Sequence, residues 1–272
     1  MTDPIEVRPG WVPPTGLRHA VFDWDGTLSF VRAGWGEVML EVYLDHLPPL
    51  PGETVGTRRQ LAHDDIWGLN GKPTIHQMQR LADRVAERGG TPLTATDYQS
   101  EYARRLGTVV QQRIDSVVSG LKPASALQPP GALAFLHALR DRGIVLHVVS
   151  GTEVHYVQVE VNALGVANLF GPRVHGPSGP SDRTYTKRGV MDAILAADGL
   201  PGTALVALGD GHVEIEQAKA LGGTAVAVAT DEERFGSGRI DPAKRTRLTG
   251  VGADLVIPDY TDCAGLLAAL GW

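Results

Sequence analysis

Apolar residues follow two different patterns along this chain. From residue 125 onward, short apolar runs alternate with segments in which apolar positions recur every three or four residues. The first pattern is typical of buried strands and the second of amphipathic helices, so their alternation predicts an α/β fold with right-handed crossovers and a parallel, three-layer sheet. The strands are expected at 144–149, 204–208, 224–229 and 254–257 with a short segment at 172–175, and the helices at 130–142, 153–164, 187–198, 213–221, 241–249 and 261–270.

One further apolar run, Ala20 to Phe22, lies far upstream of the other strands. It is apolar on both faces and ends at a glycine-containing turn, as a buried strand does. The sequence after it has helical spacing only, interrupted by glycine and proline, with helices expected at 35–47, 54–68, 74–88 and 96–118. The prediction is therefore a catalytic core formed by residues 1–30 and 125–272, with an all-helical domain, 31–124, inserted after the first strand.

Composition narrows the class of protein. Of 272 residues, 43% are hydrophobic and 21% charged, which is typical of a soluble globular protein. The net charge of −6 argues against nucleic-acid binding, which needs a basic surface. No apolar run approaches the ~18 residues that cross a membrane, and no secretory signal is recognisable at the N-terminus. With Cys263 as its single cysteine, the chain is expected in the cytoplasm, without a membrane or nucleic-acid partner.

Two carboxylates, Asp23 and Asp25, lie one residue apart where the first predicted strand ends, and Gly26 and Thr27 follow. Ligands of α/β sheets bind at this edge. An aspartate is a competent nucleophile toward phosphorus, and a second carboxyl beyond a bend that Gly26 permits can protonate a leaving oxygen and later activate water. The alternative, a calcium loop, needs a series of further oxygen ligands, which residues 29–36 do not supply.

The predicted strand 144–149 ends in Ser150 and Gly151, immediately before a predicted helix. The Ser150 hydroxyl and the free backbone N–H groups of that helix suit a phosphate. A plain N-cap role for Ser150 is an equally open interpretation, because serine caps helices in any context.

Lys187 stands at the beginning of the predicted helix 187–198. A cation there opposes the helix macrodipole, so a compensating anion, such as a phosphoryl group or an aspartate, is expected nearby. A solvated surface lysine is the alternative, and Arg183 and Arg188 compete for the same role.

A third apolar strand, 204–208, is followed by Asp210, and Glu214 lies four residues later on the first turn of the next helix. Residues four apart share one helix face, and two hard carboxylates on it suit Mg2+. Helix capping and the dipole also favour acids at this position, which is the alternative interpretation.

These four motifs, taken in order, resemble those of the haloacid dehalogenase superfamily. Asp-x-Asp-Gly-Thr at 23–27 is similar to the first motif, Ser150 to the second and Lys187 to the third. The segment 209–214 is similar to the fourth motif, Gly-Asp-x-x-x-Asp, but has Glu214 in the last position. The resemblance implies a Rossmann-like core with a helical cap after the first motif. Because Asp25 is present, it implies attack on phosphorus rather than carbon, and thus a Mg2+-dependent phosphatase.

The resemblance also implies the role of each residue. Asp23 would attack phosphorus and form an aspartyl-phosphate, while Asp25 would protonate the leaving alcohol and then deprotonate water. Lys187 would be catalytic too. The implied phosphate ligands are Ser150, Gly151, Gly26 and Lys187, and the implied metal ligands are Asp23, Asp25 through its carbonyl, Asp210 and Glu214.

The substrate is expected to be a small phosphomonoester, with a sugar or cyclitol phosphate as the first hypothesis. Arg32, Asn70 and Lys72 are candidate substrate contacts, although an ordinary turn between helices is the alternative interpretation of residues 69–74. Two alternatives stay open: a phosphomutase of the same superfamily, and a non-catalytic binding module on the same fold.

Overall fold

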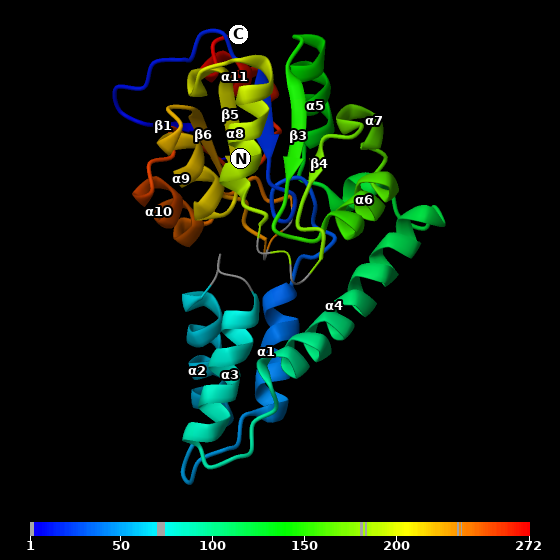
Figure 1. Cartoon of the computed structure of the whole chain (residues 1–272), viewed down its shortest axis with the longest axis vertical. Coiled ribbons are helices and arrows are strands. Elements are labelled where there is room, and N and C mark those ends of the chain that lie inside the picture. The colour runs from blue at the N-terminus through cyan, green and yellow to red at the C-terminus, as the bar shows by residue number, and fades with distance from the viewer. Residues whose placement is uncertain (1–2, 70–73, 180–181, 183, 233, 235) are drawn as a thin grey trace. The chain divides into compact units, whose positions relative to one another are not determined.

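The computed structural model of the chain describes residues 3–69, 74–179, 182, 184–232, 234 and 236–272. Its centre is a seven-stranded sheet with the order β1-β7-β6-β5-β2-β3-β4 (Figure 1). All pairings are parallel except the antiparallel pair of β1 and β7 at one edge. The strands are β1 Glu6–Val7, β2 His19–Phe22, β3 Val145–Val149, β4 Val174–His175, β5 Leu205–Gly209, β6 Thr224–Val228 and β7 Leu255–Ile257.

Strand β2 lies between β3 and β5, although more than a hundred residues separate it from either in the sequence. All four of its residues are buried, so both faces of the sheet are covered at this strand. Val21 packs into an apolar cluster with helices α8 (Lys187–Asp198), α9 (His212–Ala220) and α10 (Pro242–Gly250) on one face. Phe22 contacts Phe135 of helix α5 (Ala132–Asp141) on the other. Alternate side chains of a strand point to opposite faces, so β2 anchors both layers of helices.

Helices cover both faces of this sheet, which confirms the predicted three-layer α/β fold (Figure 1). Strand β1 and helix α7 are additions that the apolar pattern did not predict. The helices of this part are α5 Ala132–Asp141, α6 Val154–Ala163, α7 Ala167–Phe170, α8 Lys187–Asp198, α9 His212–Ala220, α10 Pro242–Gly250 and α11 Cys263–Ala269, with 3-10 turns at Ala124–Leu127 and Gly202–Ala204.

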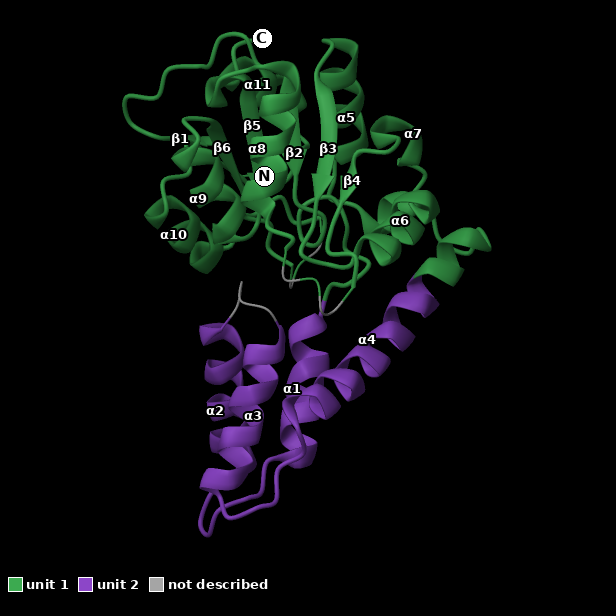
Figure 2. Ribbon diagram, viewed as in Figure 1, with its two compact units in different colours: residues 1–33, 114–272 green, residues 34–113 purple. Residues whose placement is uncertain are grey.

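The chain divides into two compact units, residues 1–33 with 114–272 and residues 34–113 (Figure 2). In its described residues the second unit consists of helices and the turns that connect them, without a strand. Helix α4 continues past residue 113, so its last turn belongs to the first unit. The functional division at 31–124 stays a prediction. The helices of this block are α1 Trp35–His46, α2 Val55–Gly68, α3 Thr74–Glu87 and α4 Ala95–Val118.

None of the helices in the described part of the chain combines the length and the hydropathy that a membrane span requires.

Candidate active site

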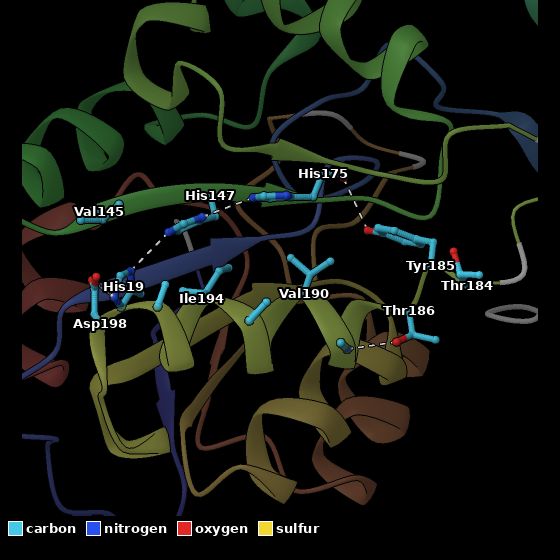
Figure 3. A pocket seen from close by; sticks show the side chains of 13 residues that line it. His19, Val145, His147, His175, Thr184, Tyr185, Thr186, Val190, Ile194 and Asp198 are labelled. Atoms are coloured by element: carbon cyan, nitrogen blue, oxygen red, sulfur yellow. Dashed lines mark hydrogen bonds and ion pairs between the residues drawn. The ribbon is translucent and has the colours of Figure 1, made fainter.

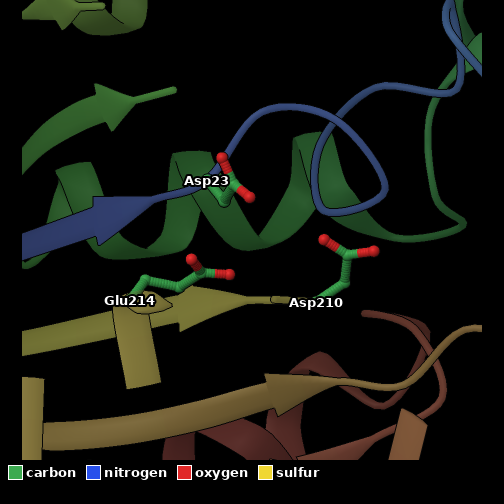
Figure 4. A group of neighbouring side chains, drawn as sticks. All are labelled: Asp23, Asp210 and Glu214. Atoms are coloured by element: carbon green, nitrogen blue, oxygen red, sulfur yellow. The ribbon is translucent and has the colours of Figure 1, made fainter. Parts of the chain in front are cut away.

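Three carboxylates meet at the carboxyl edge of the sheet. Asp23 follows β2, Asp210 follows the adjacent strand β5, and Glu214 lies in the first turn of α9. One oxygen from each lies within 4.8 Å of the others (Figure 4). Because β2 and β5 are parallel neighbours, their ends bring together residues that lie far apart in the sequence.

The turn after β2 is built around Gly26. Its φ of 72° lies in the left-handed region, and a Cβ atom there would come within 2.4 Å of Asp210 Oδ2. The Thr27 hydroxyl accepts a hydrogen bond of 3.1 Å from the backbone N–H of Asp210, which ties the turn to the end of β5. Glycine is therefore required here both by conformation and by the close approach of Asp210.

Lys187 is the cation of this cluster. Its Nζ atom lies 2.9 Å from Asp23 Oδ1 and 2.9 Å from Glu214 Oε2, and its side chain is only 12% exposed. Arg188, the competing residue, is 38% exposed and pairs with Asp192 instead. The structure therefore places Lys187, rather than Arg188, against the predicted nucleophile, and Arg183 lies outside the described residues.

Glu214 is fully enclosed. The backbone N–H of Gly211 donates to its Oε1 at 2.7 Å, and a Cβ atom at Gly209 would come within 2.2 Å of the same oxygen. Its position in the first turn of α9 thus combines the capping interaction, which was the alternative interpretation, with a place among the clustered carboxylates.

Burial and charge set the ionisation of this cluster. Burial raises the pKa of Asp23 to about 8; Lys187 opposes this shift, and the nearby Glu214 and Asp210 reinforce it. Burial also raises the pKa of Glu214, but Lys187 and backbone hydrogen bonds outweigh it, so the net direction is downward. The cluster thus holds more enclosed carboxylates than Lys187 alone can keep ionised, and the raised pKa of Asp23 reflects this.

Asp25 is held between two polar partners. The hydroxyl of Thr152 donates to Asp25 Oδ2 at 2.8 Å, and Arg32 Nε lies 3.6 Å from Asp25 Oδ1. Burial raises the pKa of this carboxyl, while Arg32 and Thr152 oppose the shift. One oxygen of Asp25 is thus held by a hydrogen bond and the other lies beside a cation, an arrangement that suits a positioned acid–base group.

Arg32 belongs to the sheet-containing unit, and its role as a substrate contact stays a prediction. Its guanidinium lies 2.8 Å from Glu160 Oε1, and Trp24 Nε1 donates to Glu160 Oε2 at 2.8 Å. Glu160, in α6, is 1% exposed, and burial together with Asp25 raises its pKa to about 7. Sequence reasoning missed Glu160, although a glutamate between the buried Val157 and Val161 of α6 was a usable signal.

Ser150 is completely buried at the end of β3. Its hydroxyl accepts a hydrogen bond of 3.0 Å from the N–H of Thr152, and the N-cap residue of α6 is Glu153, three positions later. Ser150 therefore fixes the loop between β3 and α6 and is not the N-cap of that helix. Gly151, next to it, is exposed and would meet nothing within 4 Å if it carried a Cβ atom, so the backbone there is accessible.

A second lysine lies on the other side of Asp210. Lys244 Nζ is 2.9 Å from Asp210 Oδ2 and also contacts Glu232. Burial raises the pKa of Glu232, with Lys244 acting in the opposite direction. Neither residue was predicted, because nothing in the local sequence connects α10 with the end of β5. Asn70 and Lys72 lie outside the described residues.

The residues present fit a divalent cation. Carboxylate oxygens are the ligands that Mg2+ prefers, and one oxygen of each of three carboxylates can reach a common point. Lys187 and Lys244, whose side chains are 12% and 15% exposed, compensate part of the negative charge of these carboxylates. Lys187 contacts one oxygen of Asp23 and Lys244 one oxygen of Asp210, so the second oxygen of each can face a cation. Both oxygens of Glu214 are engaged, one by the N–H of Gly211 and one by Lys187.

Solved structures share this fold at low sequence identity. One described as a predicted phosphoglycolate phosphatase from Haemophilus somnus is 18% identical, with a TM-score of 0.62 over 93% of this chain and 99% of that one. A haloacid dehalogenase-like protein from Agrobacterium tumefaciens is 17% identical, with a TM-score of 0.64 over 94% and 100%. A HAD family hydrolase from Deinococcus radiodurans, solved with bound phosphate and sodium, is 16% identical, with a TM-score of 0.60 over 94% and 97%.

No curated protein matches this sequence. A family model does match it: the model for haloacid dehalogenase-like hydrolases covers residues 20–214, from strand β2 to Glu214. The matched segment contains all four of the motifs that carry the resemblance, and the sheet places them at one edge. The chain therefore belongs to the haloacid dehalogenase-like hydrolase family.

Proposed function

We propose that this protein is a Mg2+-dependent phosphatase that hydrolyses a small phosphomonoester, with a sugar or cyclitol phosphate as the first candidate. The observation that supports this most strongly is the contact between Lys187 and Asp23 beside two further carboxylates, at the strand edge where Asp25 also lies. A carbon-attacking dehalogenase has no use for Asp25 as an acid–base group or for a cation site.

In the first step, Asp23 attacks phosphorus and the ester P–O bond breaks. Asp25, in its protonated form, gives its proton to the leaving alkoxide. Thr152 donates a hydrogen bond to one oxygen of Asp25, and Arg32 lies beside the other. The products of the step are a free alcohol, an aspartyl-phosphate at Asp23 and an ionised Asp25.

In the second step, Asp25 takes a proton from water, whose oxygen attacks the phosphorus of the aspartyl-phosphate. The bond between phosphorus and Asp23 breaks, which releases inorganic phosphate and restores the Asp23 carboxylate and the protonated Asp25. Lys187, Ser150 and the backbone N–H group at Gly151 would hold the phosphoryl oxygens. The N–H of Gly26, a predicted phosphate ligand, donates instead to the Ser29 carbonyl at 3.0 Å.

Mg2+, held by Asp23, Asp210 and the carbonyl of Asp25, would supply charge neutralisation between an anionic nucleophile and an anionic substrate. Glu214 would orient Lys187 and contribute negative charge to the cation site. The helical block 31–124, including Asn70 and Lys72, is proposed to select the substrate.

The test is phosphate release from a panel of sugar, cyclitol and small carboxylic-acid phosphates, with Mg2+ or with EDTA. Asp23→Asn should lower the rate by at least about 1000-fold, because the nucleophile is removed. Asp192→Asn, an exposed aspartate paired with Arg188, is the matched control and should keep the rate of the parent protein. Release that persists in EDTA or in Asp23→Asn would overturn the proposal, as would conversion of one sugar phosphate isomer into another without phosphate release.

A further inference from the structure

A groove with no part in the proposed hydrolysis lies on one face of the sheet, between strands β2, β3 and β4 and helix α8 (Figure 3). Its volume is about 690 Å3. The α8 side is made of small and apolar residues, among them Val190, Ala193 and Ala197. The sheet side carries three histidines, which is an unusual floor for a groove that is otherwise largely apolar.

The three histidines form a continuous row across neighbouring strands. His147 pairs in register with Val21, two residues after His19, and His175 pairs with Val149, two residues after His147. Residues two apart on a strand share a face, so all three rings point into the groove. His19 Nδ1 lies 3.3 Å from His147 Nε2, and His147 Nδ1 lies 3.5 Å from His175 Nε2 (Figure 3).

The surroundings keep these rings neutral. Burial lowers the pKa of His147 to about 3, and the neighbouring His19, His175 and Arg173 act in the same direction. The pKa values of His19 and His175 are also lowered by burial, with Asp198 opposing the shift at His19. A neutral imidazole keeps one ring nitrogen with a free lone pair, which is the form that binds metal ions.

We propose that His19 and His147 bind a divalent transition-metal ion, with Zn2+ as the reference case, on the floor of this groove. Ligand nitrogens about 2.0–2.1 Å from a tetrahedral zinc are about 3.4 Å from each other, and the separation of His19 Nδ1 and His147 Nε2 is 3.3 Å. The remaining coordination positions would open toward the groove and take water or a small ligand.

The groups behind the two rings support the same assignment. Asp198 Oδ2 lies 3.1 Å from the other ring nitrogen of His19, and His175 faces the other ring nitrogen of His147. A carboxylate beside the outer nitrogen of a ligating histidine is the usual partner in zinc sites, where it orients the ring and raises its basicity. Nitrogen donors also separate this site chemically from the carboxylate cluster, which suits Mg2+.

The test measures Zn2+ binding by calorimetry and Co2+ binding by visible absorption. All proteins carry Asp210→Asn, so that the carboxylate cluster binds these ions less well. The expected result is one equivalent of bound metal, lost or weakened at least tenfold in His147→Gln and weakened about 10–100-fold in Asp198→Asn. His155→Gln, an exposed histidine in α6, should bind as the parent does.

Asp198 is 57% exposed, so Asp198→Asn keeps the test decisive if His147→Gln fails to fold. Equal affinities in the parent, His147→Gln and Asp198→Asn would overturn the proposal. An absence of Zn2+ and Co2+ binding in the parent would do the same, leaving the row as a chain of hydrogen-bonded neutral rings. Neither readout depends on phosphate release, so this test is independent of the proposed hydrolysis.

Discussion

The two units of the chain use charged side chains differently. In the helical unit, ion pairs such as Arg59–Glu37 are exposed, with 50% and 60% of the side chains accessible. In the sheet-containing unit, Lys187 and Asp23 are each 12% exposed and Glu214 is 2% exposed. Exposed pairs contribute little to stability, whereas buried charges cost a large desolvation penalty unless they are compensated.

Burial alone does not distinguish a site from a structural ion pair, because the helical unit also has an enclosed pair. Arg88 and Glu53 have side chains 6% and 10% exposed and form two close contacts, so their charges cancel. The sheet edge differs in balance, because two lysines face more carboxylates than they can neutralise. The carboxylates there are Asp23, Asp210, Glu214 and Glu232, against Lys187 and Lys244. An excess of enclosed carboxylates over lysines, which raises the pKa of Asp23, marks the place for a cation, and burial by itself does not.

The largest expected effect is that of Lys187→Met. Removing this ammonium leaves Asp23 and Glu214 buried without their partner, so the free energy of unfolding should fall by about 3–5 kcal/mol. Phosphate release should fall at least about 100-fold. Urea unfolding with and without Mg2+ measures the first effect, and Mg2+ should restore part of the stability. A variant as stable as the parent would mean that Asp23 and Glu214 do not need Lys187 to compensate their charge.

Glu160→Gln should act on the rate more than on the fold. Glu160 fixes Arg32, and Arg32 lies against Asp25, so the change loosens the proposed acid–base group without touching the nucleophile. We expect kcat to fall about 10–100-fold with little change in KM, and we expect the pH dependence of kcat to shift. Glu216→Gln, an exposed glutamate in α9, is the control. An equal loss in both variants, or an effect on KM alone, would contradict a positioning role.

The residues of the candidate site differ in how well the sequence predicts them. Asp23, Ser150 and Asp210 each follow an apolar strand directly, so local pattern alone places them at one edge of a parallel sheet. Glu232 and Lys244 meet at Asp210 only because β5 and β6 are neighbours and α10 packs beside them, and nothing local encodes that meeting.

The histidine row escaped prediction for the same reason. Its three members lie on β2, β3 and β4, and they meet only when these strands are adjacent and in the observed register. From the sequence alone each is a single histidine, and single histidines are more often structural. Charges next to a strand end are therefore predictable, whereas contacts between strands depend on the order of strands in the sheet.

Acidification should destabilise the protein through His147. Its folded pKa, about 3, lies below the ordinary value of 6.5, so the folded state binds fewer protons than the unfolded state between these pH values. Stability contributed by this group is present above pH 6.5 and lost as the pH falls, by about 1–2 kcal/mol from pH 7 to pH 5. Urea unfolding in EDTA across this range should show a shallower dependence in His147→Gln. An unchanged slope would place the pKa of His147 near its ordinary value.

The smallest expected effect is that of Arg59→Ala in the helical unit. Because the Arg59–Glu37 pair is exposed, its loss should change the free energy of unfolding by less than about 0.5 kcal/mol, and added salt should remove most of that. Arg88→Ala, which leaves the enclosed Glu53 without its partner, should cost clearly more. Urea unfolding of both variants, together with that of Lys187→Met, orders three classes of ion pair: exposed, enclosed and balanced, and enclosed with an excess of carboxylates. If Arg59→Ala were as costly as Arg88→Ala, exposure would not govern how much an ion pair contributes to stability in this protein. The enclosed carboxylates at the sheet edge would then no longer indicate a cation site.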